Sequence, residues 1–303
     1  MPENHLEEES FAADLYGYFD DLRAAVCDVH GDWTVKGFID VYTHIYTLSL
    51  DTKVLSKVME LLLLPVVARF ANERGYRLEL ARQQNHYPDI TLTNALGFRY
   101  AVDVKTTYRT GTDNRGRSRV AGMTLGTYGG YFRGRSSLAT ITYPYESYSG
   151  HFVLGVVYTR IENIDENKVY NISELGDIPS VAKDFVFFLQ EKYRIASDSP
   201  GSGNTKNIGS TRFIDRLTSG SGVFSSLGVE VFDDYWMNYR TSEMARGEGF
   251  VSQPYRNLRE YKAYKEMGAA ILAVPEEQVV SEAEDDALLT LDDDQNPLPE
   301  MSP

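Results

Sequence analysis

The chain has 303 residues, and its 44 Asp and Glu against 30 Lys and Arg give a formal net charge of −14. Its single cysteine, Cys27, excludes an intrachain disulfide framework and a cysteine-rich zinc site, and its histidines show no metal-ligand spacing. No signal peptide is recognisable, and the leucine run at residues 61–64 is too short to span a bilayer. We therefore expect a soluble, cytoplasmic protein without a membrane partner.

The acidic residues are concentrated at the two ends of the chain. Residues 1–21 hold seven acids and residues 276–303 hold ten, and neither segment contains Lys or Arg. Without these seventeen, 27 acids remain against 30 Lys and Arg, so the middle of the chain has a balance of +3. The charge of the whole chain argues against a nucleic-acid partner, whereas the charge of its body is compatible with DNA.

We expect one folded domain between these acidic ends. The predicted parts are an acidic N-terminal extension over residues 1–14, a domain over 15–267 and an acidic, disordered tail over 268–303. The domain shows no internal repeat and no composition shift that would mark a linker. The tail is interpreted as a solubilising segment, or as a competitor with phosphates for a basic cleft.

The predicted elements, in chain order, mix helices and strands. Asp51 is placed to cap a helix that runs to about Asn72, with Pro65 as a kink and Gly75 after its end. Periodicity does not decide whether residues 185–189 form a buried strand or a helix. The other predicted elements are strands near 77–82, 89–93, 98–108 and 152–160 and helices near 230–246 and 254–267.

The second and third strands carry a Pro-Asp pair and, fourteen residues after its aspartate, an Asp-x-Lys triplet. Two carboxylates and a lysine suit metal-dependent phosphodiester hydrolysis. Asp89 and Asp103 can hold a hard cation such as Mg²⁺ through oxygen ligands. The cation polarises the scissile phosphate and lowers the pKa of a bound water. Lys105 can stabilise developing negative charge or help to poise the attacking water.

The geometry of a hairpin supports this pairing of side chains. Because side chains alternate along a strand, Asp103 and Lys105 share one face. A tight turn over residues 94–97 would bring the preceding strand alongside, with Asp89 opposite Val102 or Asp103. On the bare pattern, an Asp/Lys pair on a strand is more often a solvated face. The surroundings of the motif therefore decide between the two interpretations.

Longer strings around the motif resemble a known family. They are residues 51–56 (DTKVLS), 83–89 (QQNHYPD), 103–108 (DVKTTY), 124–126 (TLG), 157–160 (VYTR), 201–205 (GSGNT), 207–210 (NIGS) and 234–236 (DYW). In these strings, from about Leu15 to about Met267, the chain resembles a homodimeric type II restriction endonuclease of the PD-(D/E)xK nuclease superfamily. The resemblance implies an α/β (α+β) fold with a mixed central sheet flanked by helices and a small dimerisation subdomain near residues 33–50.

The resemblance also implies the roles of the active-site residues. By position, Asp89 and Asp103 become the metal-binding carboxylates and Lys105 the catalytic lysine. Glu60 falls where the similar enzymes have an acidic residue that lines the active site and binds metal. Its alternative role is that of a glutamate on the surface of a helix. The implied cofactor is Mg²⁺, and two or more ions can bind in each active site.

Residues 201–207, the recognition loop, match the loop that enters the major groove of DNA. Its glycines allow close approach of the backbone to the bases, Asn204 can bond an adenine, and Thr205 can contact a thymine. Without the match, this segment would be interpreted as a flexible loop. The positions that the resemblance assigns to DNA binding are Gly201, Ser202, Gly203, Asn204, Thr205, Lys206, Asn207, Gln83, Gln84, Asn85, Lys53, Thr106 and Thr107.

The chain departs from the family pattern in three places, one of which is a shorter turn over residues 94–97. Lys206 stands where the similar loop has a small polar residue, which adds charge near DNA. Between residues 109 and 135, six arginines lie among glycines, as a surface that grips phosphates or as a solvated basic loop. Because the rest of the recognition loop is kept, the resemblance implies the palindrome GATATC, cut at its centre to leave blunt ends with 5′-phosphates.

The leading hypothesis is thus a Mg²⁺-dependent type II restriction endonuclease that cleaves double-stranded DNA as a homodimer. A two-fold dimer presents two copies of the site to a palindrome. A cognate DNA methyltransferase is expected in the same system, without direct binding. The alternatives are a repair nuclease on the same core and a sequence-specific DNA-binding protein that has lost cleavage.

Overall fold

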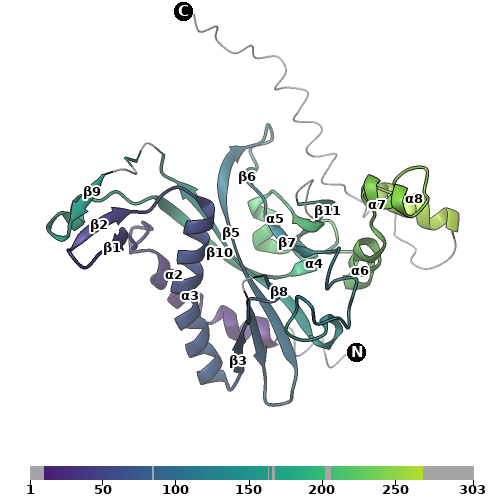
Figure 1. The fold of residues 1–303 in the computed structure, drawn as a ribbon, viewed down its shortest axis with the longest axis horizontal. Helices are drawn as coiled ribbons and strands as arrows, with labels where there is room; N and C mark the ends of the chain where they lie inside the picture. Colours follow the sequence, from purple (N-terminus) through teal and green to yellow (C-terminus); the bar gives the residue numbers. More distant parts are fainter. Residues whose placement is uncertain (1–9, 84, 163, 166–167, 202–205, 269–303) are drawn as a thin grey trace, which may run out of the picture. The chain divides into compact units, whose positions relative to one another are not determined.

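The structure is a computed structural model that describes residues 10–83, 85–162, 164–165, 168–201 and 206–268. Its chain divides into two compact units (Figure 1). The first unit comprises Met1–Thr110 and Gly134–Glu191, and the second comprises Gly111–Arg133 and Lys192–Pro303. Over the described ranges, no helix is both long enough and apolar enough to cross a membrane. Most of the predicted acidic tail lies outside the described residues.

A mixed sheet with the strand order β10-β8-β5-β4-β3 forms the centre of the first unit (Figure 1). Only β5 and β8 run parallel, and the other neighbours are antiparallel. The strands are β3 (Arg77–Leu80), β4 (Ile90–Thr93), β5 (Arg99–Thr112), β8 (Gly150–Arg160) and β10 (Ala182–Glu191). This sheet confirms the predicted mixed α+β fold, and β10 shows that residues 185–189 form a strand.

The long helix α3 (Thr52–Arg74) begins and ends as its sequence predicts. The side chain of Asp51 accepts hydrogen bonds from the main-chain N–H groups of Lys53 and Val54, which caps the N-terminus. Gly75 ends the helix in the left-handed conformation, with φ of 72°. The helix continues through Pro65. The residues at its two ends therefore set where the helix begins and ends.

The main core of the first unit lies between the sheet and the helices. Leu63 and Phe70 of α3 pack in one cluster with Tyr100 and Val102 of β5 and with Leu22 of α2 (Phe19–Val26). Transfer of such apolar surface from water is the dominant stabilising contribution to a fold of this kind. The face of the sheet that carries Tyr100 and Val102 is thus the buried, helix-covered face.

Residues before the predicted domain start at residue 15 also pack in this core. Residues 10–16 are helical, and the fully buried ring of Phe11 stacks on Tyr100 with its centroid 4.3 Å away. The chain's single cysteine also lies in this core: Cys27 is buried, and burial raises the pKa of its thiol. In the sequence, Phe11 lies among acidic residues, which favoured the interpretation of this segment as an acidic extension.

A smaller sheet of the first unit contains β1 (Gly37–Ile39), β2 (His44–Thr47) and β9 (Val169–Asn171), all antiparallel. Ile45 and Tyr170 pack beneath it with Ile178. Large apolar side chains on and next to these strands stay exposed: Phe38, Ile39, Val41, Tyr42, Tyr46, Val169, Ile172 and Leu175. The small sheet thus carries a group of apolar side chains that its own unit does not cover.

The second unit contains the antiparallel sheet β11-β12-β7 and several short helices. The predicted helix over 230–246 is two helices, because Tyr239 is extended and Thr241 caps a new N-terminus. The predicted helix over 254–267 begins later, because Asn257 accepts a hydrogen bond from the N–H of Glu260. The elements are β6 (Ser118–Val120), β7 (Thr124–Thr127), α4 (Lys192–Ile195), β11 (Ala196–Pro200), β12 (Asn207–Ser210), α5 (Ile214–Ser219), α6 (Val229–Asn238), α7 (Ser242–Gly247) and α8 (Leu258–Gly268).

Candidate active site

The hairpin of β4 and β5 brings the two predicted carboxylates together. Ile90 pairs with Val102, so Asp89, one residue before Ile90, lies at the level of Asp103. The side chain of Asn94 stabilises the turn by accepting hydrogen bonds from two main-chain N–H groups of that turn. The hairpin and its register therefore have the predicted arrangement.

Asp103 and Lys105 lie on the face of β5 opposite the helices. Tyr100 and Val102 point into the helix-covered core, and side chains alternate along a strand. Asp103 and Lys105 therefore belong to the other face, as predicted. The apolar packing of α3 against one face of β5 is what directs these two charged side chains to the other.

Asp89, Asp103 and Lys105 form a carboxylate–lysine cluster. The Lys105 Nζ atom lies 2.6 Å from Asp103 Oδ2 and 3.8 Å from Asp89 Oδ2. Asp89 Oδ2 also accepts a 2.8 Å hydrogen bond from the N–H of Val104. The Asp103 side chain is only 6% exposed, whereas those of Asp89 and Lys105 are 27% and 25% exposed. The cluster is thus rigidly held and still open to solvent on one side.

Burial and mutual repulsion perturb the titration of this cluster. Burial raises the pKa of Asp89 to about 7, and the negative charge of Asp103 and a hydrogen bond between the two carboxyls act in the same direction. Burial alone would lower the pKa of Lys105, but the charges of Asp103 and Asp89 outweigh it and the pKa is raised. Lys105 is therefore an ammonium at neutral pH, beside two carboxylates that one lysine does not fully compensate.

This donor set fits a hard divalent cation. Asp89 and Asp103 offer adjacent carboxylate oxygens, the ligand type that Mg²⁺ takes in proteins. The raised pKa of Asp89 shows that the site favours additional positive charge, which a divalent cation would supply. The fit rests on the chemistry of these two side chains.

Glu60, the third predicted metal ligand, comes from a different element than the two aspartates. It lies on α3, and its Oε1 atom is 2.7 Å from the Nζ atom of Lys57. Its charge acts on Lys105 and contributes to the raised pKa of that lysine. Within the ranges that the structure describes, no group of three or more His, Cys, Asp or Glu side chains is arranged to hold a metal ion. Glu60 is therefore an electrostatic neighbour of the cluster.

The remaining predicted contacts of the first unit lie at several places. Lys53 is exposed on the first turn of α3, and Gln83 and Asn85 are exposed between β3 and β4. Gln84 lies outside the described residues. Thr106 faces the helices, with its Oγ1 atom 2.5 Å from Ser56 Oγ. Thr107 is buried. The exposed polar residues suit contact with a ligand, and the two threonines tie β5 to its surroundings.

The second unit holds the two ends of the recognition loop, whose residues 202–205 lie outside the described residues. The N–H of Gly201 donates to the carbonyl of Asn207 at 2.9 Å, which closes the loop at its base. The carbonyl of Lys206 accepts from the N–H of Tyr128 at 2.7 Å and from Thr127 Oγ1 at 2.9 Å. The base of the loop is thus fixed to β7.

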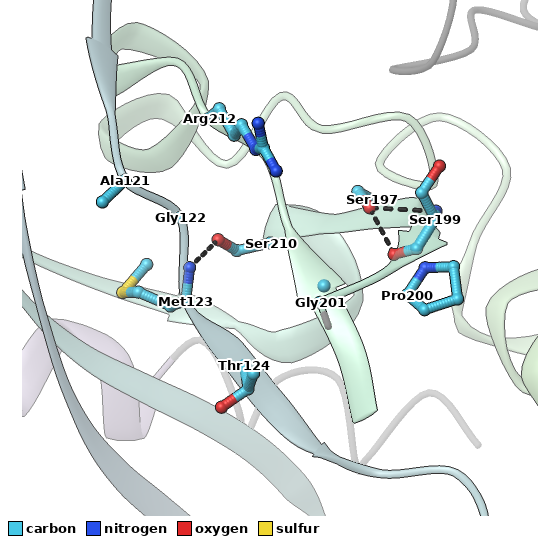
Figure 2. Close-up of a pocket in the computed structure, with 11 residues that line it drawn as sticks. Ala121, Gly122, Met123, Thr124, Ser197, Ser199, Pro200, Gly201, Ser210 and Arg212 are labelled. Carbon is cyan, nitrogen blue, oxygen red and sulfur yellow. Dashed lines mark hydrogen bonds between the residues drawn. The ribbon is translucent and has the colours of Figure 1, made fainter. Parts of the chain in front are cut away.

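The exposed side chain of Lys206 lies against Gly129. A Cβ atom at residue 129 would lie 2.6 Å from Lys206 Cδ, so only glycine leaves room for the lysine stem. A small pocket of about 130 Å³ lies next to the base of the loop (Figure 2). In Figure 2 the hydroxyl of Ser210 meets the N–H of Met123, a hydrogen bond of 2.9 Å. These contacts stabilise the strands from which the loop projects.

The arginines between residues 109 and 135 are largely engaged by their own chain. Arg109 donates to Thr159 Oγ1 at 3.0 Å and to the carbonyl of Asp184. Arg117 pairs with Asp113 at 2.8 Å, and Arg133 donates to main-chain carbonyl groups of α6 and the residue that follows it. Three of the six arginines that the sequence offered for phosphate binding thus make contacts within the protein.

The structure adds neighbours of the cluster that the sequence did not single out. Gly155 of β8 pairs with Lys105, and Phe188 of β10 pairs with Gly155. A Cβ atom at Gly155 would lie 1.9 Å from the ring of Phe188, so this ring covers β8 at the level of the lysine. His151 lies on the same strand. No local pattern marks these residues, because their place depends on strand pairing between distant segments.

Two carboxylates on a hairpin, with a lysine two residues after the second, lie together on a mixed sheet, which is the arrangement that the sequence predicts for a nuclease of the PD-(D/E)xK class. The sequence matches the family described as restriction endonuclease EcoRV over residues 29–266. It is 38% identical over 246 residues to the type II restriction enzyme EcoRV of Escherichia coli, which covers 80% of this chain and 95% of that enzyme. The chain therefore belongs to the EcoRV restriction endonuclease family, and it is a restriction enzyme.

Proposed function

We propose that the protein is a Mg²⁺-dependent homodimer that cleaves double-stranded DNA at GATATC, with a central blunt cut that leaves 5′-phosphates. The observation that carries the proposal is the carboxylate–lysine cluster, in which Lys105 lies 2.6 Å from Asp103 and 3.8 Å from Asp89. Family membership adds the reaction class. In this proposal the protein works in the cytoplasm of a prokaryotic cell, alongside a cognate DNA methyltransferase that it does not bind directly.

Each residue of the cluster has a role that its position supports. Asp89 and Asp103 would hold Mg²⁺, and the N–H of Val104 orients the Asp89 carboxylate by the bond to Oδ2. When bound, Mg²⁺ supplies Lewis-acid polarisation of the scissile phosphate and a lower pKa for water. The Lys105 ammonium stabilises the negative charge that develops on the phosphoryl oxygens as water attacks in line and the 3′ oxygen leaves.

The apolar surface of the β1-β2-β9 sheet supports the homodimer. Phe38 and Ile39 are 55% and 58% exposed, and Val41 is 90% exposed. Burial of such side chains in a two-fold interface would remove apolar surface from water. One active site per protomer then gives one cut in each strand of a palindrome.

The anchored base of the recognition loop supports sequence-specific binding. The bonds of Gly201 and Lys206 set where the loop leaves the second unit. Asn204 and Thr205, which lie outside the described residues, are proposed to contact the bases. Lys206 is the departure that bears most directly on the choice of GATATC, since it adds a cation at the end of the loop.

The test is digestion of a plasmid with a single GATATC site, with Mg²⁺ and with EDTA, followed by sequencing of the ends. A single blunt cut at the centre of the site, only with Mg²⁺, is the expected result. Cleavage at another sequence would refute the specificity and keep the nuclease. Folded protein that binds DNA without cutting would refute the catalytic assignment.

The variant that tests the catalytic role of Asp103 is Asp103→Asn, which keeps the size of the side chain and removes its charge. We expect its cleavage rate to fall by at least about 100-fold, the scale for removal of one preorganised electrostatic contact. DNA binding measured without metal should persist. Cleavage at the normal rate would remove Asp103 from the site.

A further inference from the structure

Tyr87, two residues before Asp89 in the chain, contacts His151 of β8 in the first unit. The hydroxyl of Tyr87 is 2.8 Å from His151 Nδ1, and His151 Nε2 is 3.2 Å from the carbonyl oxygen of Tyr145. We propose that Tyr87 and His151 form a positioning pair that sets the place of the Asp89 carboxylate. The inference rests on the proposed metal-binding role of Asp89.

The hydrogen bonds define one tautomer of His151. A carbonyl oxygen only accepts, so His151 Nε2 carries the hydrogen and donates to Tyr145. The neutral imidazole then has Nδ1 as its acceptor, and the hydroxyl of Tyr87 donates to it. The ring of Tyr145 stacks on the imidazole, with centroids 3.8 Å apart and an interplanar angle of 13°, which fixes the plane of the ring. The histidine therefore presents one acceptor in one direction.

Tyr87 transmits this direction to Asp89 through a short and restrained segment. Its N–H donates to the carbonyl of Thr140 at 3.0 Å, and its carbonyl accepts from the N–H of Thr142 at 2.9 Å. The next residue, Pro88, has a fixed φ. Asp89 follows, and its carbonyl accepts from the N–H of Ala81 at 3.1 Å. Few backbone torsions between Tyr87 and Asp89 are therefore free to absorb a displacement of Tyr87, so such a displacement would also move Asp89.

His151 lies on β8, the strand against which both carboxylates are placed. It pairs with Ala101 of β5, and two residues further along the same ladder Val153 pairs with Asp103. Side chains two residues apart share a face, so His151 belongs to the face of Asp103 and Lys105. Asp103 is placed against β8 by the strand ladder, and Asp89 is placed against β8 through His151 and Tyr87. The pair thereby fixes the separation of the two carboxylates.

Burial makes the bond between Tyr87 and His151 costly to lose. Tyr87 is only 4% exposed, and a buried hydroxyl that loses its partner carries the full desolvation cost of that group. A substitution that removes the Nδ1 acceptor of His151 would therefore displace the Tyr87 side chain from its present position. This coupling predicts that substitutions at residue 151 act on Asp89 although they do not touch it.

Three substitutions separate the two bonds of the imidazole. Tyr87→Phe removes the hydroxyl and keeps the ring. His151→Asn places an amide atom near the former Nδ1 and keeps a partner for Tyr87, whereas His151→Gln places it near Nε2 and keeps the contact to Tyr145. If the pair positions Asp89, Tyr87→Phe and His151→Gln should cleave DNA more slowly than the wild type. His151→Asn should retain most of the wild-type cleavage rate.

The measurements are single-turnover cleavage of a GATATC plasmid with Mg²⁺ and calorimetric binding of Mg²⁺ to the DNA-free protein. A displacement of a catalytic group by about 1 Å costs about 100-fold in rate. We expect a smaller displacement of Asp89 in Tyr87→Phe and His151→Gln, and therefore cleavage about tenfold slower than in the wild type. Both should also bind Mg²⁺ more weakly. His151→Asn should cleave within about threefold of the wild type, less than the loss expected from a displaced carboxylate.

Tyr148→Phe is the matched control. Tyr148 is also buried and contacts His151, with centroids 5.4 Å apart, and its hydroxyl lies 3.0 Å from Thr91 Oγ1 of β4. Its loss should lower the melting temperature without slowing cleavage. If the cleavage rates of all four variants simply follow their melting temperatures, the positioning role is refuted. If Tyr87→Phe folds poorly, the comparison of His151→Asn with His151→Gln still decides the question. Cleavage by Asp89→Asn would instead refute the proposed active site itself.

Discussion

Replacement of Asp89 by asparagine should stabilise the metal-free protein at pH 8 while it abolishes cleavage. Asparagine keeps a carbonyl oxygen that can accept the hydrogen bond from Val104, now 2.8 Å from Asp89 Oδ2. It removes the negative charge that burial and Asp103 disfavour, the cause of the raised pKa of about 7. The substitution therefore tests the electrostatics of the cluster separately from its chemistry.

The sign and size of the effect follow from linkage between folding and protonation. The pKa of Asp89 is about 7 in the folded protein and about 4 in an unfolded chain. Between these values the folded protein holds a proton that the unfolded chain has lost, so the contribution of Asp89 to stability falls as pH rises from about 4 to 7. At about 1.4 kcal/mol per pKa unit, the cost above pH 7 is at most about 4 kcal/mol. Since the side chain is 27% exposed, solvent screening reduces this to about 1–3 kcal/mol.

Urea unfolding of wild type and Asp89→Asn in EDTA, at pH 5 and pH 8, measures this difference. The variant should be the more stable protein at pH 8, and its advantage should shrink at pH 5. Asp28→Asn is a control in the same unit: the pKa of Asp28 is lowered, chiefly by a hydrogen bond from the N–H of Asp32, so its effect should not change over this range. An Asp89→Asn advantage that is the same at both pH values would refute the conclusion that burial raises the pKa of Asp89.

Three further predictions concern other parts of the molecule. Lys206→Thr should reduce the slope of log affinity for non-specific DNA against log salt by about 0.9, one phosphate contact; an unchanged slope would place the ammonium away from DNA. Val41→Asp, at a side chain that is 90% exposed, should dissociate dimers in sedimentation runs while each protomer stays folded, and dimers that persist would place the interface elsewhere. Gly155→Ala should cost about 1–3 kcal/mol in urea unfolding, since the new Cβ would lie 1.9 Å from the Phe188 ring; full stability would mean that this ring is free to move.

Local rules sufficed for the elements that present the active site. Asp51 and Gly75 bound α3 because capping chemistry acts within a few residues. The register that brings Asp89 level with Asp103 follows from a short hairpin turn and from side-chain alternation. The carboxylate–lysine cluster could thus be predicted before any tertiary contact was known.

Features that depend on distant segments could not be predicted in the same way. His151 reaches its position because β8 runs parallel to β5, a pairing that no local pattern encodes. The proximity of Glu60 on α3 to Lys105 on β5, seen in its effect on the pKa of that lysine, likewise depends on packing between distant segments. The break between α6 and α7 depends on Tyr239, a residue that periodicity alone would place inside a helix.

The burial of Cys27 gives the protein a practical advantage for spectroscopy. The only thiol of the chain is 5% exposed, and its raised pKa keeps it as the unreactive thiol near neutral pH. A cysteine introduced at an exposed position such as Gln83 would then be the one site that takes up a spin label or a fluorophore. Distances between labels on the two protomers of the proposed dimer could then be measured with and without DNA, without first removing a native cysteine.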